Sequence, residues 1–251
     1  MKKKLTKHLI YSHLRIDMLA YQKLFFPFSL DETSVDKVWT FSTNGCFITL
    51  TGEKSQCKTS LLFQAAVTLS TKNDQVIFIR PKHLDKLPLH VHGMPSPKPL
   101  AMQHVKLMYM WSVSDLVQYL ARIHMNSVIP AAILVDDLDH YVTQLTKETS
   151  TEQAFAKLGV LLKDAADFCS KKRDDQCLLL AACKLPEQGN LFHSIYEQFG
   201  DVWNINRGEV STQRQNLFLT MSSNLQYKTF FYIEDEQIFL DKLTRKTGVF
   251  C

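Results

Sequence analysis

Between residues 46 and 207, short apolar runs alternate with longer segments of helical periodicity. The apolar runs are CFITL (46–50), VIFIR (76–80), VKLMYMW (105–111), AAILVDD (131–137), CLLLAAC (177–183) and DVWNI (201–205). Their length and β-branched content are typical of buried strands. Helices are predicted over 58–70, 112–125 and 151–172. Strands that alternate with helices predict an α/β fold, with a mostly parallel sheet and helices on both of its faces.

After residue 207 the apolar runs follow one another without helices. NLFLTMS (216–222) and TFFYIEDEQIFL (229–240) are predicted to be antiparallel strands, the second as a hairpin that turns at residues 234–236. We therefore expect one α/β domain over 46–251 with an antiparallel C-terminal extension. Residues 1–45 are predicted to form a helical preface that packs on the core, with a break at Pro27.

The segment between the second and third predicted strands (81–100) contains five prolines. It is predicted to be a loop excursion within the domain, because the alternation of strands and helices resumes after it. His90 and His92 lie in this loop without a third candidate ligand, so no metal site is expected there.

Composition narrows the functional classes only modestly. The 251 residues are 45% hydrophobic, which suffices for a sizeable core, and the net charge of +4 permits nucleic-acid contact without requiring it. Six cysteines show neither CxxC pairs nor zinc spacing, which favours reduced thiols in the cytosol or nucleus. The sequence has no apolar run of the ~18 residues that span a membrane, and its basic start is a poor secretory signal, although a mitochondrial presequence is an alternative.

The segment FITLTGEKSQCKTSLLFQAA (47–66) has the outline of a phosphate-binding loop, G-x-x-x-x-G-K-[ST], between a strand and a helix. The loop residues are Gly52, Glu53, Lys54, Ser55, Gln56, Cys57, Lys58 and Thr59. Backbone N–H groups of such a loop and the start of its helix bind phosphate oxygens. The pattern further predicts that Lys58 reaches the β and γ phosphates and that Thr59 ligates magnesium.

Two residues weaken this match. Cys57 occupies the second glycine position, where a side chain costs on the order of 1–2 kcal/mol if the backbone must be left-handed. The backbone N–H of Cys57 is retained, so we expect a weakened site and not an erased one. The charge of Glu53 disfavours phosphate if its side chain points inward, and Lys54 is placed to offset it.

An acidic pair follows the fourth predicted strand, within AAILVDDLDHY (131–141). Asp136 is predicted to hold magnesium through water, and Asp137 is a candidate catalytic base that orients a water. The alternative is a buried strand that ends in solvated acids. In open α/β sheets ligands bind at the carboxyl ends of the strands, where both the loop and the acidic pair are expected to lie.

The chain resembles the RecA/recombinase superfamily. More closely, it resembles the SWSAP-type recombinase paralogues, which pair with a SWIM-domain zinc protein in the metazoan Shu complex. The stretches that carry the resemblance span about 46–185 and are LTGEKSQCKTSLLFQAA, VIFIR, VKLMYMWSVSDLVQYLARI, ILVDDLDHYV, FAKLGVLLKDAADFCSKK and CLLLAAC.

The resemblance implies a RecA-like core that binds ATP and magnesium, with ATP on Gly52, Lys58 and Thr59 and magnesium on Asp136. It also implies a nuclear protein that supports homologous recombination. Its expected partners are the SWIM-domain zinc protein in a heterodimer, recombinase filament proteins and single-stranded DNA.

Three departures from recombinases predict at most a weak ATPase. Lys82 lies near the position where recombinases carry the glutamate that activates water, and Lys184 replaces a polar sensor that is often glutamine. Cys57 alters the phosphate loop itself. These residues are compatible with ATP as a structural ligand that stabilises the fold. The alternative is a nucleotide-inactive scaffold of the same fold that acts only through protein contacts.

The sequence offers only general candidates for DNA contact and docking. Basic clusters are present at Lys2–Lys4 with Lys7, at Lys171–Arg173, and at Lys242 with Arg245 and Lys246. Each is a candidate phosphate contact or simply a solvated surface. Because the segment after the fifth strand is short and not basic, strong independent DNA binding is not expected. FQAA (63–66) matches the F-x-x-A docking pattern of recombinases, but its helix predicts core packing.

Overall fold

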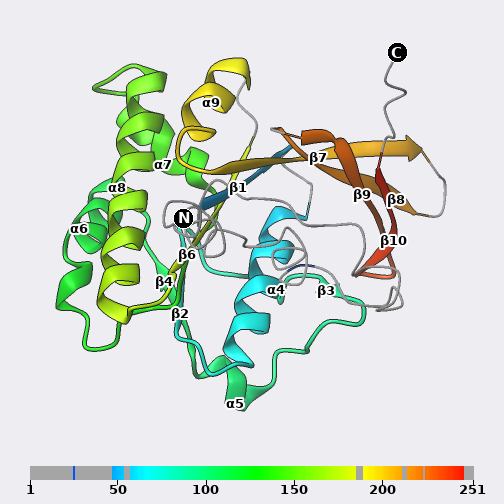
Figure 1. Ribbon diagram of the computed structural model, residues 1–251, viewed down its shortest axis with the longest axis horizontal. Coiled ribbons are helices and arrows are strands. Elements are labelled where there is room, and N and C mark those ends of the chain that lie inside the picture. The colour runs from blue at the N-terminus through cyan, green and yellow to red at the C-terminus, as the bar shows by residue number, and fades with distance from the viewer. Residues whose placement is uncertain are drawn as a thin grey trace, which may run out of the picture.

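The computed structural model describes Phe25 and residues 47–53, 57–184, 189–210, 214–222 and 224–245 (Figure 1). Apart from Phe25, the predicted helical preface over 1–45 lies outside these residues. Phe25 is fully buried, and its ring makes an edge contact with Trp203 at a centroid distance of 5.9 Å. This residue of the N-terminal segment is therefore part of the core.

One ten-stranded sheet runs through the described part of the chain, in the order β3-β10-β9-β8-β7-β1-β6-β5-β2-β4. Strands β7, β1, β6, β5, β2 and β4 are parallel neighbours, whereas β7 to β10 pair antiparallel. The strands are β1 Phe47–Gly52, β2 Val76–Arg80, β3 His90–Val91, β4 Val105–Tyr109, β5 Ala132–Val135, β6 Leu178–Lys184, β7 Asp201–Val210, β8 Gln215–Met221, β9 Asn224–Glu234 and β10 Gln237–Arg245.

Helices cover both faces of the parallel half of the sheet. Helix α4 lies on one face, and α6, α7, α8 and α9 lie on the other (Figure 1). The helices are α4 Lys58–Ser70, α5 Pro99–Met102, α6 Val113–Ala121, the 3₁₀ turn Ile123–Met125, α7 Leu138–Leu145, α8 Thr151–Arg173 and α9 Gly189–Tyr196. None of these helices is long and apolar enough to cross a membrane.

The strands feed two hydrophobic clusters because their side chains alternate between the faces of the sheet. In β2, Val76 and Phe78 join the cluster around α4, whereas Ile77 and Ile79 join the cluster under α6, α7 and α8. This two-sided burial explains why the strands are continuous apolar runs in the sequence. The predicted α/β fold with an antiparallel C-terminal extension is confirmed.

Several predicted element bounds need correction. β4 ends at Tyr109 and not at residue 111, because Trp111 has left the sheet and is exposed. β5 ends at Val135, so Asp136 and Asp137 follow the strand instead of completing it. The sequence analysis also missed the short helices α5, α7 and α9. The predicted hairpin turn is present at Asp235 and Glu236, both of which have positive φ.

The proline-rich loop closes back on the sheet. Its residues His90 and Val91 form β3, which pairs parallel with Gln237 and Ile238 of β10. Nε2 of Gln64 on α4 also holds the loop by donating a hydrogen bond to the Pro95 carbonyl at 3.1 Å. The excursion therefore covers α4 and joins the sheet edge, as part of the same domain.

Candidate functional site

The predicted phosphate loop lies between β1 and α4, at the carboxyl end of the parallel strands (Figure 1). Gly52 is the last residue of β1, and Lys58 and Thr59 begin α4. Residues Lys54, Ser55 and Gln56 lie outside the described part of the chain. The strand–loop–helix arrangement that the motif requires is present.

Lys58 spans this loop. Its Nζ donates hydrogen bonds to the carbonyl oxygens of Gly52 at 3.0 Å and Glu53 at 2.5 Å. The residue is 8% exposed, and burial lowers the pKa of Lys58, while the negative charges of Asp139 and Asp136 act in the opposite direction. The ammonium group is thus partly desolvated and held among loop oxygens, where it interacts strongly with an anion.

Thr59 and Asp136 meet although they are 77 residues apart in sequence. The Thr59 Oγ1 donates to Oδ2 of Asp136 at 2.8 Å, because β6 is the single strand between β1 and β5 and the carboxyl ends of these strands adjoin. Asp136 is 1% exposed. Burial, assisted by the charge of Asp137, raises the pKa of Asp136 to about 6 against the opposing effects of Thr59 and Arg80.

These oxygens are the donor types that magnesium takes in phosphate sites. A hydroxyl and a buried carboxylate lie beside a helix start and a lysine, so the residues present fit a magnesium–phosphate group. Lys58 and the start of α4 would hold the phosphates, and Thr59 and Asp136 would hold the metal. Bound magnesium would neutralise phosphate charge there.

Arg80 is a site residue that sequence reasoning missed. It ends β2, next to β5, and its Nε lies 3.5 Å from Oδ2 of Asp136. One terminal nitrogen lies 3.6 Å from Oδ2 of Asp137. The adjacency of β2 and β5, with Ile79 opposite Val135, places Arg80 beside the acids. The signal in the sequence that could have identified Arg80 is its place as a basic residue at the end of a predicted core strand.

Lys82, which was assigned to the glutamate position of recombinases, points elsewhere. Its Nζ lies 5.4 Å from the ring centroid of Trp111. Trp111 is 58% exposed, and its carbonyl accepts hydrogen bonds from α7, including one from Nε2 of Gln144 at 2.9 Å. The residue of the β2 end that contacts the acidic pair is therefore Arg80.

Asp137 is placed beside the site but is engaged in an ion pair. It occupies the N-cap position of α7 with a left-handed backbone (φ 51°) and makes no side-chain capping hydrogen bond. Its side chain is 48% exposed and faces Arg80. Its role as a catalytic base stays a prediction, and Arg80 competes with a water for the carboxylate oxygens.

Cys57 is the N-cap of α4, and its carbonyl accepts the hydrogen bond from Leu61 N–H at 3.0 Å that starts the helix. Its backbone angles are φ 0° and ψ 18°, so the residue does not adopt the left-handed conformation for which a cost was considered. The side chain packs against the α4 cluster, and burial raises the pKa of the Cys57 thiol to about 12.

The carboxylate of Glu53 forms an ion pair outside the phosphate loop. Its Oε2 pairs with a terminal nitrogen of Arg207 on β7 at 2.7 Å. Both side chains are well exposed, so this pair contributes little stability. It does offset the negative charge that the sequence placed next to a phosphate site. The compensating residue is Arg207, while the proposed role of Lys54 lies outside the described residues.

Lys184 lies at the expected end of β6, opposite Gly52 in the sheet register. Its backbone N–H donates to Oδ1 of Asp139 at 2.7 Å. Asp139, in the first turn of α7, is a second residue that the sequence analysis missed, and it links α7 to the strand beside the phosphate loop. Lys184 itself is exposed.

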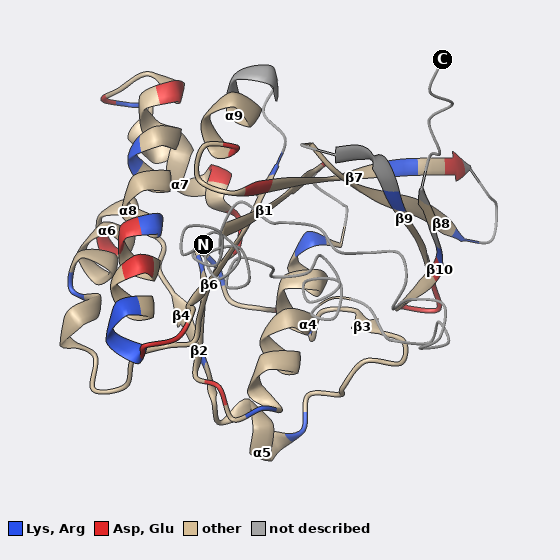
Figure 2. Cartoon of the chain, viewed as in Figure 1, with Lys and Arg blue, Asp and Glu red and all other residues tan. Residues whose placement is uncertain are grey.

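Within the described part of the chain, the predicted basic clusters do not gather at this site. Lys171 and Lys172 are exposed at the end of α8, while Arg173 pairs with Asp74. Lys242 lies over the Phe230 ring, and the clusters at Lys2–Lys4 with Lys7 and at Lys246 fall outside the described residues. Figure 2 shows lysines and arginines spread over several elements, with acidic residues between them.

Phe63 and Ala66 of the FQAA segment are buried, as expected for core packing. The Phe63 ring contacts Phe78 of β2 at a centroid distance of 6.3 Å. An F-x-x-A docking role would require Phe63 to leave this core.

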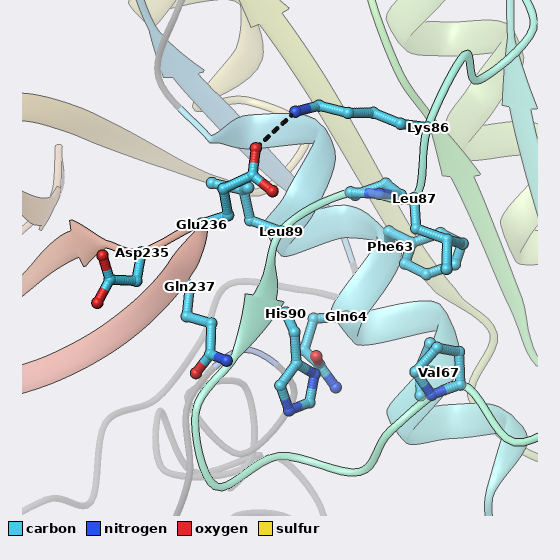
Figure 3. Close-up of a pocket in the computed structure, with 12 residues that line it drawn as sticks. Phe63, Gln64, Val67, Lys86, Leu87, Leu89, His90, Asp235, Glu236 and Gln237 are labelled. Atoms are coloured by element: carbon cyan, nitrogen blue, oxygen red, sulfur yellow. Dashed lines mark hydrogen bonds and ion pairs between the residues drawn. The ribbon is translucent and has the colours of Figure 1, made fainter.

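A pocket of about 410 Å³ lies apart from the phosphate loop, and none of the predicted site residues lines it (Figure 3). Helix α4, the proline-rich loop and the β9–β10 turn form its walls. The ion pair between Lys86 and Glu236, 3.0 Å long, joins two of these walls. His90 lines the pocket and His92 stacks on Phe239. The described residues contain no cluster of three or more His, Cys, Asp or Glu that could hold a metal.

No protein-family model matches the chain, and no curated protein matches it. Among solved structures, it is similar to a KaiC-like protein from Pyrococcus horikoshii OT3, with a TM-score of 0.56 and 14% identity over 87% of this chain and 97% of that chain. It is also similar to the flagellar accessory protein FlaH from Methanocaldococcus jannaschii, with a TM-score of 0.53 and 11% identity over 79% and 90% of the two chains.

At these identities the likeness establishes the fold alone. The chain has a RecA-like α/β fold with a largely parallel central sheet and antiparallel C-terminal strands. Within that fold, the phosphate loop and the acidic pair occupy the carboxyl ends of β1 and β5, which is the edge where open α/β sheets bind ligands.

Proposed function

We propose that this protein binds ATP and magnesium at the junction of β1 and α4. The observation that carries the proposal is the 2.8 Å contact between Thr59 Oγ1 and Asp136 Oδ2, beside the buried ammonium group of Lys58. A hydroxyl, a carboxylate and a lysine converge from separate elements on the start of a helix, which is an arrangement suited to a phosphate chain and its metal.

The biological role that we propose is that of a recombinase paralogue. It supports homologous recombination repair of DNA double-strand breaks in the nucleus, as a heterodimer with a SWIM-domain zinc protein. Recombinase filament proteins and single-stranded DNA are its further partners. The resemblance over residues 46–185 supports this role, and the RecA-like fold is compatible with it. Because the described basic residues are dispersed, we assign DNA contact to the complex rather than to this chain alone.

Hydrolysis is proposed to be weak. A residue that activates water must offer a free carboxylate or another base near the phosphate. Recombinases carry a glutamate just after the strand that corresponds to β2. In this protein the strand ends in Arg80, which pairs with Asp137, the candidate base. In this proposal ATP acts mainly as a ligand that stabilises and organises the protein.

The second candidate is a scaffold of the same fold that acts only through protein contacts. Two observations favour it. The Lys58 ammonium group already has partners in the loop carbonyls of Gly52 and Glu53, and Arg80 already provides a cation to Asp136. A site whose charges are satisfied internally gains less from a ligand.

Equilibrium binding of Mg-ATP to the purified protein separates the two candidates. Wild type, Lys58→Ala and a control, Lys72→Ala, are compared alone and with the SWIM-domain partner. Lys72 is exposed just beyond the last turn of α4, so its loss leaves the site intact. We expect saturable binding to wild type and Lys72→Ala and none to Lys58→Ala. If folded wild type binds no Mg-ATP, either alone or with the SWIM-domain partner, the nucleotide proposal fails and the scaffold is supported.

A second readout addresses the repair role. Cells that lack the protein are supplied with wild type, Lys58→Ala or Lys72→Ala, and repair of induced double-strand breaks is scored. Loss of repair with Lys58→Ala at equal protein level is the expected result. Full repair by that variant would show that nucleotide binding is dispensable for the role.

A further inference from the structure

Arg80 brings a permanent positive charge to the oxygen atoms that the proposed function assigns to magnesium. Oδ2 of Asp136 accepts the Thr59 hydroxyl at 2.8 Å, and the same oxygen lies 3.5 Å from Arg80 Nε. The guanidinium group also lies 3.6 Å from Asp137. An arginine stays protonated in proteins, so this charge does not depend on pH.

The fold holds this charge in place. Arg80 ends a strand that is paired on both sides, with β5 and with β4, and its side chain is 12% exposed. Its backbone carbonyl accepts the N–H of Met110 at 2.9 Å. The Nε atom is buried and has no hydrogen-bond partner among the described groups. A desolvated cation of fixed charge beside the Asp136 carboxylate competes with a metal ion for that oxygen.

Arg80 removes one unit of negative charge from the site. Asp136, Asp137 and Asp139 contribute three negative charges, and Lys58 and Arg80 contribute two positive charges. Without Arg80, three acidic residues would face Lys58 alone and attract a divalent cation. With Arg80, the net charge offered to a metal is only −1, and the guanidinium group competes with the metal for the oxygens of Asp136 and Asp137.

We propose that Arg80 supplies much of the positive charge that magnesium would supply at this site, so that metal-free ATP binds nearly as well as Mg-ATP. This inference rests on the proposed function, because it concerns the metal requirement of the same site. Thr59 and Asp136 can still hold magnesium, but the metal contributes little to affinity. Arg80 therefore determines how strongly the site distinguishes Mg-ATP from metal-free ATP.

The test is calorimetric titration of the full chain with ATP, once with magnesium and once with excess EDTA. For wild type we expect the Kd in EDTA to exceed the Kd in magnesium by less than about threefold. For Arg80→Gln, which removes the charge but keeps a polar side chain, we expect a ratio above about tenfold. Arg80→Lys, which keeps the charge, and Arg122→Gln, at an exposed residue after α6, should resemble wild type.

The outcomes are distinguishable. Wild type that binds ATP with magnesium but loses it in EDTA overturns the inference and leaves the proposed function standing. Equal ratios in wild type and Arg80→Gln also overturn it, because another group then replaces the metal. Wild type that binds no ATP under either condition overturns the proposed function and the inference with it. If Arg80→Gln does not fold, the wild-type comparison alone decides.

Discussion

At the scale of single residues, Cys57 shows how a loop position can lose its glycine and keep its backbone role. Its carbonyl starts α4 through the bond from Leu61 N–H, and its side chain packs on the α4 cluster. A glycine would retain the first contribution and lose the second. We therefore expect glycine at this position to favour nucleotide binding and cysteine to favour stability.

We predict that Cys57→Gly binds ATP a few-fold more tightly than wild type, because removal of the Cβ lets the loop approach the phosphates more closely. The same change should lower the free energy of unfolding by about 1 kcal/mol, through lost burial and a more flexible unfolded chain. Calorimetric titration and urea unfolding measure the two effects. Cys57→Ala, the control, should lose stability with a smaller gain in affinity. Unchanged affinity in both variants would show that the cysteine does not limit the site.

Asp201 is a second residue with a measurable effect, away from the site. It begins β7 beside Ile48, is buried, and its Oδ2 has no hydrogen-bond partner among the described groups. Burial raises the pKa of Asp201 from 3.8 to about 6. A carboxyl whose pKa is raised by folding destabilises the protein when ionised, so its cost is present above about pH 6 and absent below about pH 4.

We therefore predict that Asp201→Asn is more stable relative to wild type at pH 7.5 than at pH 4.5, with a difference on the order of 1–3 kcal/mol. Urea unfolding at both pH values measures it, and Asp164→Asn, at an exposed position on α8, is the matched control. A difference between Asp201→Asn and wild type that does not change with pH would mean that Asp201 is solvated in the folded state.

At the scale of elements, the parts that the sequence predicts are those with long apolar runs or long helical periods. β1, β2, β5, β6 and α8 belong to this group, because both faces of the strands are buried and α8 runs for 23 residues. Helix α7 has only eight residues, and its buried positions Leu138, Tyr141 and Val142 make a single helical repeat. One repeat is too short to distinguish a helix from a loop.

The site shows the same division between local and tertiary information. The phosphate loop follows a motif with a fixed spacing and Asp136 directly follows an apolar run, so both could be named from the sequence. Arg80 and Asp139 act through neighbours in space, which depend on the order of the strands and on a helix that the sequence did not reveal. Lys82 was placed near the recombinase glutamate position by its distance from β2 along the sequence, which does not reveal that Arg80 is the residue of this strand end that pairs with the acids.

The packing of α8 leads to a prediction about Gly159. A methyl group at this buried position would lie 2.5 Å from Cε2 of Phe199, whose ring packs against Phe47 and Tyr196. Alanine favours helices over glycine by about 1 kcal/mol, but overpacking costs about 1–3 kcal/mol. We predict that Gly159→Ala is net destabilising, as measured by urea unfolding.

Two further variants test this explanation. Val160→Ala, at the exposed neighbouring position, should change stability by less than about 0.5 kcal/mol. In the Gly159→Ala background, Phe199→Ala should cost less than it does in wild type, because the clash has been removed. Strictly additive effects of the two substitutions would contradict a contact between the methyl group and the ring.

At the scale of the whole molecule, one hydrophobic cluster joins the parallel half of the sheet to the antiparallel half. It contains α4 residues such as Leu61 and Leu62 together with Trp203 of β7, Leu217 of β8 and Phe231 of β9. Helix α4 packs on the parallel strands and on β3, and the same cluster continues into β7, β8 and β9. A ligand held at the start of α4 should stabilise the antiparallel extension as well as the loop that contacts it.

This leads to a prediction about cooperativity. Mg-ATP at 100 times its Kd should raise the free energy of unfolding by about 2.7 kcal/mol and the Tm by several degrees. Peptides from α4 and from β8 and β9 should gain hydrogen-exchange protection together, because opening either half breaks the common cluster. Lys58→Ala should show neither effect, whereas Lys72→Ala should show both. Protection confined to α4 and its loop would mean that the extension opens independently of the nucleotide site.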